Sequence, residues 1–316
     1  METVQSVLSI LMMIGIGVFV AWKLGFDEKN SAGLASLVIN ITLPAYMISN
    51  ISLNYTTESL LAIAPGLAVP FAALGICYVL GKLTARLVGV SENRHGSFAS
   101  MFALTNTIFI GLPVNTILFG EKSIPYVLLF YIGNTVLFWT LGVYGISRDG
   151  SQRGQKLFAL ANIRRVFSPP LSAFMLAVAF VLTGTRPPML ILDVCKTVGS
   201  MTTPLSMLFI GIVLYTVDWK AIRPDLETWT LLAARFVVGP LVVIAFCRYL
   251  PLPLLMKKVF VIQASMPIMT QTAIIVKAYH GDYKFAAVQT SISTLVSLAT
   301  IPIYMIIMDN FNIFGG

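Results

Sequence analysis

The chain has 316 residues, of which 57% are hydrophobic and 11% are charged, and its formal net charge is +8. Its mean hydropathy is +0.86. A soluble globular domain carries about 25% charged residues, so this composition excludes an ordinary soluble protein and indicates a chain that lies mostly in a lipid bilayer.

Ten apolar segments are each long enough to cross the hydrocarbon core of a bilayer, which is about 30 Å thick and needs roughly 20 helical residues. The predicted spans are Val4–Trp22, Leu34–Leu53, Leu60–Gly81, Gly96–Leu118, Ile124–Ile146, Ser168–Thr183, Val198–Val217, Trp229–Tyr249, Lys258–Tyr279 and Ala286–Met308. Charged residues cluster in the short connections between them. The sequence therefore predicts an all-α polytopic membrane protein with ten transmembrane helices and the lipid bilayer as its surroundings.

The lysines and arginines predict the orientation. Fourteen of the 21 lie in the connections after the odd-numbered spans, and six lie in the other connections and the termini. Positive residues concentrate on the cytoplasmic side, so both termini are expected outside the cell and the protein in the plasma membrane. No basic residue precedes the first span, which is expected to be a retained helix rather than a signal peptide. The scatter of basic residues over short loops argues against a nucleic-acid partner.

The two halves of the chain repeat one another. The matching pairs are Pro70 with Pro240, Cys77 with Cys247, Asn106 with Pro267 and Gly120 with Gly281. Each half holds five spans, an odd number, so the second half must enter the membrane from the opposite side, as in the inverted repeats of secondary transporters. The expected domains are a first repeat over residues 1–146, a basic cytoplasmic linker over residues 147–167 and a second repeat over residues 168–316.

The fourth and ninth spans carry glycine, proline and polar side chains at mid-membrane depth. Proline removes a backbone donor and clashes with the carbonyl four residues earlier, so both helices are expected to break there and cross. The expected substrate-binding residues are Thr105, Asn106, Thr107, Asn115, Gln263, Ser265, Thr270 and Gln271, and the expected crossover residues are Gly111, Pro113 and Pro267. The alternative is that the prolines only kink helices whose polar residues join neighbouring helices.

Helix ends and amides are the main charge partners that this crossover offers to a ligand. Two half-helix N-termini supply about half a positive charge each, which suits one carboxylate. Arg235 in the eighth span and Lys277 at the end of the ninth are the candidate charge partners for a second carboxylate. Each also has a structural interpretation, with Arg235 bonded to a carbonyl or snorkelling and Lys277 anchoring its helix at the interface.

Segments in both halves resemble the auxin efflux carrier family, which includes plant PIN-type carriers and bacterial malate and malonate permeases. The resemblance is carried by Asn106-Thr-Ile-Phe-Ile-Gly-Leu-Pro113, Arg235-Phe-Val-Val-Gly-Pro240, Gln263-Ala-Ser-Met-Pro267, Val276-Lys-Ala-Tyr279 and Leu43-Pro44. In plant members a proline directly precedes the asparagine that matches Asn106, where this chain has Thr105.

The resemblance implies a homodimer in which spans one, two, six and seven form a scaffold and the other six spans move as a transport unit, in an elevator-type mechanism. It implies a small organic anion as the substrate, with malate, malonate or an auxin-like acid as candidates. No cofactor and no metal ligand set is expected. Coupling to Na⁺ or H⁺ stays open, although no carboxylate lies deep in a span to relay protons.

The alternatives are a sodium-coupled carrier like the bile-acid symporters, or a channel or receptor that uses the same broken helices. Enzyme chemistry is not expected, because the chain has no HExxH, P-loop or GxSxG motif and no paired carboxylates within its spans. Three cysteines cannot form a disulfide framework.

Overall fold

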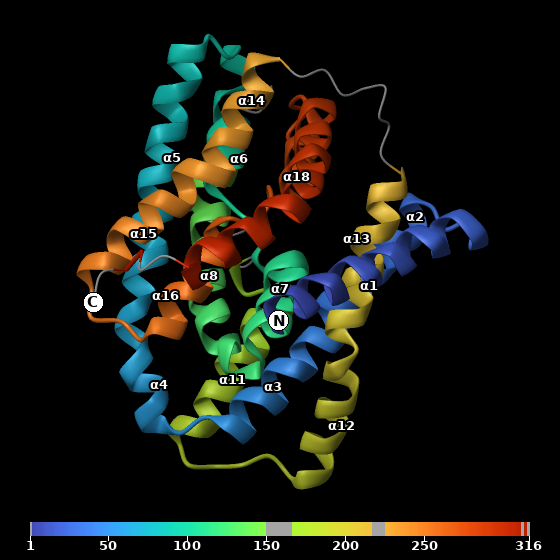
Figure 1. Ribbon diagram of the computed structural model, residues 1–316, viewed down its shortest axis with the longest axis vertical. Coiled ribbons are helices and arrows are strands. Elements are labelled where there is room, and N and C mark those ends of the chain that lie inside the picture. The colour runs from blue at the N-terminus through green and yellow to red at the C-terminus, as the bar shows by residue number, and fades with distance from the viewer. Residues whose placement is uncertain (1, 150–165, 217–224, 311–312, 315–316) are drawn as a thin grey trace. The chain divides into compact units, whose positions relative to one another are not determined.

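The computed structural model describes residues 2–149, 166–216, 225–310 and 313–314 (Figure 1). These residues are helical apart from turns, connections and one isolated β-bridge. The prediction of an all-α chain is therefore confirmed. Most of the predicted basic linker, residues 150–165, lies outside the described residues.

Six of the described helical segments are long and apolar enough to cross a membrane: Asn30–Asn54, Thr57–Val88, Glu121–Asp149, Met189–Thr216, Leu226–Tyr249 and Tyr283–Met308. Shorter apolar helices cover Leu8–Leu24, Thr107–Phe119 and Pro169–Leu182. These segments correspond to nine of the predicted spans, and the ninth predicted span is divided between two short helices. The chain is thus a polytopic membrane protein, and the count of ten spans stays a prediction.

Contacts between residues divide the chain into two units, which are described separately. Unit 1 comprises residues 1–65, 112–125 and 167–217, and unit 2 comprises residues 66–111, 126–166 and 218–316. The helices of unit 1 are α1 (Glu2–Leu24), α2 (Glu28–Leu37), η1 (Val38–Thr42), α3 (Leu43–Asn54), α4 (Thr57–Ile63), α7 (Leu112–Phe119), η5 (Glu121–Ser123), α11 (Pro169–Leu182), α12 (Met189–Ser200) and α13 (Thr202–Thr216).

The helices of unit 2 are α5 (Ala68–Val88), η3 (Glu92–Arg94), α6 (His95–Ala103), η4 (Thr107–Gly111), α8 (Ile124–Leu137), η6 (Phe138–Gly142), α9 (Val143–Asp149), α14 (Leu226–Ala233), η8 (Ala234–Val238), α15 (Gly239–Tyr249), α16 (Leu254–Ala264), α17 (Gln271–Ala278) and α18 (Tyr283–Asn310). The short helix η2 (Ala64–Leu67) spans the boundary between the two units at residues 65 and 66. The first two residues of α8, Ile124 and Pro125, belong to unit 1 and the rest of α8 belongs to unit 2.

Glycines let the helices of unit 1 approach closely. α1 packs on α13, and a Cβ atom added to Gly17 would lie 2.5 Å from the backbone oxygen of Leu208. α3 packs on α11 and α12, and a Cβ atom added to Gly199 would lie 2.6 Å from the Cα of Tyr46 (Figure 1). In lipid, helices associate by such close packing of small residues rather than by burying apolar surface away from water.

In unit 2, α6 packs between α5 and α9 over a cluster of buried apolar side chains. Asp149 at the end of α9 caps the start of α6, because its carboxylate oxygens accept hydrogen bonds from the backbone N–H groups of Gly96 (2.7 Å) and Ser97 (2.6 Å). The negative charge of an acidic group at a helix N-terminus also interacts favourably with the positive end of the helix dipole, which stabilises the helix. The cap fixes the end of α6 opposite to the end that forms the candidate site.

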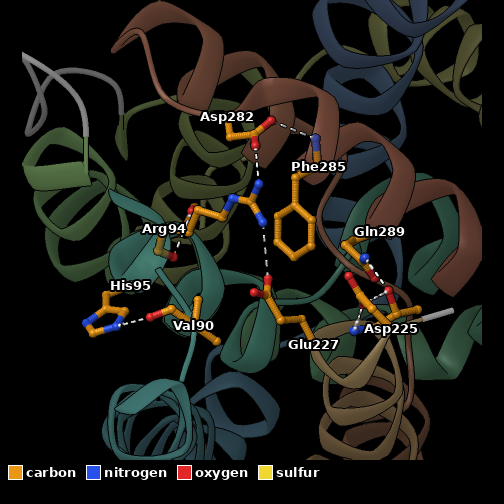
Figure 2. A network of polar contacts seen from close by, with 10 residues as sticks. Val90, Arg94, His95, Asp225, Glu227, Asp282, Phe285 and Gln289 are labelled. Carbon is orange, nitrogen blue, oxygen red and sulfur yellow. Dashed lines mark hydrogen bonds and ion pairs between the residues drawn. The ribbon is translucent and has the colours of Figure 1, made fainter. Parts of the chain in front are cut away.

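Arg94 joins three helix ends at one edge of unit 2 (Figure 2). Its guanidinium donates to Asp282 before α18 (2.7 Å) and to Glu227 in α14 (3.4 Å), and it lies 4.8 Å from the centre of the Phe285 ring. Nearby, the Gln289 amide of α18 donates to the Thr228 hydroxyl of α14 (2.7 Å). These contacts hold the first turns of α6, α14 and α18 together.

Packing of α1 against α13 predicts opposite effects for two neighbouring glycines. Gly17→Ala should lower the melting temperature in lipid nanodiscs, because the added methyl group overlaps the backbone of α13 at a cost of roughly 1–3 kcal/mol. Gly15→Ala is the matched control: a Cβ atom there has no neighbour within 4 Å, and alanine favours the helix by about 1 kcal/mol. A Gly17→Ala protein as stable as the Gly15→Ala protein would contradict the described packing.

Candidate functional site

Two helices of unit 2 stop and restart, and their non-helical segments pair with one another. α6 ends at Ala103 and η4 begins at Thr107, while α16 ends at Ala264 and α17 begins at Gln271. Thr105 and Ile268 form an antiparallel β-bridge. Beside it the Asn106 N–H donates to the Pro267 carbonyl over 2.8 Å. Pro267 has no backbone N–H, so its carbonyl is the only main-chain group of this residue that can form a hydrogen bond.

Side chains from two further helices satisfy the bridged backbone. Asn134 of α8 accepts from the Thr105 N–H (2.9 Å) and donates to the Thr105 carbonyl (3.0 Å). Ser293 of α18 accepts from the Ile268 N–H (3.1 Å). Both side chains are fully buried, with 0% of their surface exposed. Unpaired backbone groups at membrane depth cost several kcal/mol each, so these two residues stabilise the interruption.

Asn106 links the two segments through its side chain. Its amide nitrogen donates to the Thr270 hydroxyl (2.8 Å), and its amide oxygen accepts from the Phe109 N–H (3.2 Å). The second bond caps the helical segment that begins at Thr107, since an asparagine oxygen can take up one of the unpaired donors of a first turn. Both polar atoms of the Asn106 side chain thus form a hydrogen bond within the protein, and a ligand that binds at the Thr270 hydroxyl would compete with the contact from Asn106.

Gln263 is the last polar residue of α16 and packs on η4. Its amide nitrogen donates to the Thr107 carbonyl (3.3 Å), and its side chain lies where a Cβ atom at Gly111 would be. Gly111 is thus needed for this contact. The amide oxygen of Gln263 and the hydroxyl of Thr105 are buried and have no hydrogen-bond partner among the described residues.

Arg235 bonds to the carbonyl ends of both interrupted helices. It lies in η8 with 1% of its surface exposed, and its guanidinium donates to Phe102 (2.7 Å) in α6, Ala264 (2.9 Å) in α16 and Met266 (3.4 Å) just beyond α16. Carbonyl groups at a helix C-terminus carry partial negative charge and have no partner in their own helix, so a cation is stabilised there. Of the interpretations of Arg235, these hydrogen bonds are the ones that the structural interpretation expects, in which the guanidinium bonds to backbone carbonyls.

The remaining expected site residues fall into a buried group and an accessible group. Ser265, the residue directly after α16, is fully buried and donates to the Ile262 carbonyl of that helix (2.9 Å). Thr270 and Gln271 are only partly buried, and no hydrogen bond of the Gln271 side chain is formed within the described residues. Gln271 is the first residue of α17. Thr270 and Gln271 thus form the accessible edge of the site, with Asn106 directly behind.

Three expected residues lie elsewhere. Asn115 and Pro113 are buried in α7, which belongs to unit 1. Lys277 is exposed, and its ammonium nitrogen lies 5.1 Å from the centre of the Tyr283 ring. This contact fits the interpretation of Lys277 as an anchor at the end of α17. The described residues contain no group of three or more His, Cys, Asp or Glu side chains that could hold a metal ion.

Neither Asn134 nor Ser293 is among the site residues expected from the sequence. The signal for Ser293 was a polar stripe in an otherwise apolar span: Gln289, Ser293 and Ser297 recur every four residues and share one helix face. All three are buried. Such a stripe in a transmembrane helix indicates that this face meets other polar groups of the protein.

These features define a multi-pass, all-helical membrane protein with two paired helix interruptions. The profile of the membrane transport protein family matches residues 3–305, so the chain belongs to this family, that of the auxin efflux carriers. The resemblance predicted from the short motifs is therefore confirmed. The chain acts in membrane transport and is not an enzyme.

Three relatives match the chain almost end to end. An uncharacterized transporter of Methanothermobacter thermautotrophicus is 25% identical over 98% of this chain and 99% of its own length. An uncharacterized transporter of Methanocaldococcus jannaschii is 27% identical over 98% of this chain and all of its own length. A provisionally assigned malonate transporter of Rhizobium meliloti is 22% identical over 95% of this chain and 94% of its own length.

The contacts of Arg235 predict a structural role. Arg235→Met should strongly lower the yield and melting temperature of the purified protein, because it leaves three carbonyls unpaired at about 1–3 kcal/mol each. Arg235→Lys should recover part of the loss, since one ammonium can reach fewer of these carbonyls. Lys277→Met, which removes an exposed charge, is the control and should change stability little. Equal melting temperatures for the two methionine variants would refute this role.

Proposed function

We propose that this protein is a secondary transporter of small organic anions, and that the paired interruption of α6 and α16 is its substrate site. The observation that carries the proposal is the edge formed by Thr270 and Gln271, with Asn106 behind it. This edge offers hydroxyl and amide groups at the start of α17, where backbone N–H groups and the helix dipole favour an anion.

Charge compensation at the site supports a carboxylate ligand. Arg235 neutralises the negative C-terminal ends of α6 and α16. The first turns of η4 and α17 contain no acidic residue that would offset the positive charge of their N-terminal ends. Two helix ends of about half a charge each balance one carboxylate. We expect the substrate to place a single carboxylate at this edge.

The architecture that we propose is a 5+5 inverted repeat with broken, crossing fourth and ninth spans. Its support is the correspondence between the halves: Asn134 in the fifth predicted span bonds the backbone of Thr105, and Ser293 in the tenth bonds the backbone of Ile268. Equivalent helices thus support equivalent segments, as an inverted repeat requires. The domains would be residues 1–146 and 168–316, joined by the linker 147–167.

We further propose an elevator-type mechanism in a homodimer, with unit 1 as the dimerising scaffold and unit 2 as the transport unit. The support is the division of contacts, because unit 1 holds the first, second, sixth and seventh predicted spans and unit 2 holds most of the others. Residues 112–125, the second half of the fourth span and the start of the fifth, group with unit 1. Both termini are proposed to lie outside the plasma membrane, following the distribution of basic residues.

Malonate and malate are the first substrates to test, since one relative is named for malonate transport. An auxin-like aromatic acid is the next. A fully ionised dicarboxylate needs a second cationic partner, and neither the buried Arg235 nor the exposed Lys277 lies free at the edge. Bound Na⁺ is the alternative partner, favoured by the unpartnered oxygens of Thr105 and Gln263.

Transport should be measured in proteoliposomes with radiolabelled malonate, malate and indole-3-acetate, with and without a Na⁺ gradient. We expect saturable uptake and counterflow of at least one of these acids, as alternating access requires. Uptake of none of them, with neutral or cationic solutes carried instead, would refute the anion assignment. A current that rises linearly with concentration, without counterflow, would indicate a channel.

Gln271 is the residue whose replacement tests the site itself. Gln271→Glu is nearly isosteric and places a negative charge at the edge, so it should raise KM for the transported acid about tenfold or more, which corresponds to roughly 1.4 kcal/mol. Gln5→Glu makes the same change at an exposed position of α1 and should leave KM unaltered. An unchanged KM for Gln271→Glu in a protein of normal stability would remove this edge from the substrate path.

A further inference from the structure

Unit 1 contains a cavity, lined mostly by residues with polar side chains, that the proposed transport function does not use. The cavity has a volume of about 340 Å³, and all of the residues that line it belong to unit 1. Cavities of about 300–1,000 Å³ are typical of sites for small molecules. The candidate substrate site lies wholly in unit 2. The two sites can therefore be tested separately.

One face of α3 forms the first wall of this cavity. Tyr46, Ser49, Asn50, Leu53 and Asn54 all line it, and their spacing of three, four, seven and eight residues places them on one helix face. Tyr46, Ser49 and Asn50 are buried, whereas Leu53 and Asn54 are exposed. The cavity therefore has a buried polar floor and an open rim at the end of α3.

One face of α12 and α13 forms the opposite part of the lining. Lys196, Gly199, Ser200 and Thr203 follow the same spacing of three, four and seven residues. Gly199 is the point at which α12 touches α3, since a side chain there would overlap Tyr46. One turn away from this contact, Lys196 lies on the exposed rim of the cavity.

Two opposite charges line the cavity without pairing. Glu121 of η5 and Lys196 of α12 are both lining residues, and both are exposed. Neither side chain takes part in an ion pair within the part of the chain that the structure describes, so the charged groups of Glu121 and Lys196 lie more than 4.0 Å apart. A ligand that carries both charges can bridge them.

Asn50 points to the same ligand chemistry from the cavity floor. It is 4% exposed, and its amide oxygen is buried without a hydrogen-bond partner in the described structure. A buried acceptor without a donor costs about 1–3 kcal/mol, which a ligand N–H group can recover. Ser49 donates to the Tyr46 carbonyl (3.2 Å), so its hydroxyl oxygen can also accept from a ligand.

We propose that this cavity binds a small zwitterion of the α-amino acid class. The ligand carboxylate pairs with Lys196, and its ammonium group is held by Glu121 and the amide oxygen of Asn50. Leu53 and Tyr46 offer apolar surface to the ligand side chain. A plain carboxylate would leave the amide oxygen of Asn50 without a donor and would face the like charge of Glu121, and for this reason the cavity discriminates against the anions proposed for unit 2.

The test uses the full-length protein in nanodiscs and measures its melting temperature with each of the twenty amino acids up to about 10 mM, because a ligand that binds the folded state raises this temperature. L-leucine is compared directly with 4-methylpentanoate, which lacks the ammonium group, and with 3-methylbutylamine, which lacks the carboxylate. We expect at least one amino acid to stabilise the protein, and both single-charge analogues to be without effect at the same concentration.

Variants locate the binding. Lys196→Met and Glu121→Gln should each weaken amino-acid affinity about tenfold or more. Lys122→Met is the matched control, since Lys122 is exposed next to Glu121 and does not line the cavity, and its affinity should be unchanged. Gln271→Glu, which perturbs the candidate substrate site, should also leave amino-acid binding intact.

Three results would overturn the proposal: no stabilisation by any amino acid, equal stabilisation by 4-methylpentanoate, or loss of binding in Gln271→Glu rather than in Lys196→Met. Failure of carboxylate uptake by the wild-type protein contradicts only the proposed transport function, because this binding test does not depend on transport.

Discussion

Every backbone group released by the two helix interruptions must find a partner inside the protein, because the hydrocarbon core of a bilayer offers none. This requirement explains most of the polar residues at the core of unit 2. Asn134 and Ser293 pair with the bridged strand-like residues, and Asn106 caps the segment that follows. Without these partners, the non-helical segments would be too costly to maintain.

Arg235 meets the same requirement with a full charge. It bonds to the carbonyl ends of α6 and α16, where the partial charges of two helix dipoles are negative. A buried arginine is expensive unless its donors are satisfied, and here three carbonyls satisfy it. The electrostatic result is that the C-terminal ends are neutralised while the N-terminal ends stay positive, which is the condition for an anion site made without a free cationic side chain.

Polar side chains gather at separate places in the two units. In unit 2 they surround the interrupted helices, and Asn106, Asn134, Gln263 and Ser293 form internal hydrogen bonds there. In unit 1 they line a cavity whose floor is buried and whose charged rim is exposed and unpaired. The first arrangement stabilises an unusual backbone, whereas the second leaves binding groups available to a ligand.

The sequence by itself determined the all-helical membrane architecture, because twenty-residue apolar runs have few other stable forms in a bilayer. Short motifs around Asn106 and Pro267 also determined the family. Pro267 lies in the non-helical segment between α16 and α17, as the loss of a backbone donor predicts, whereas the segment between α6 and η4 contains neither proline nor glycine, and Gly111 and Pro113 are helical. The tertiary structure decided which polar groups meet. The pairing of Arg235 with carbonyls 29 and 133 residues away in the chain is one example, and the support of Ile268 by Ser293 is another. Such contacts depend on how distant helices pack, and local sequence patterns do not specify that packing.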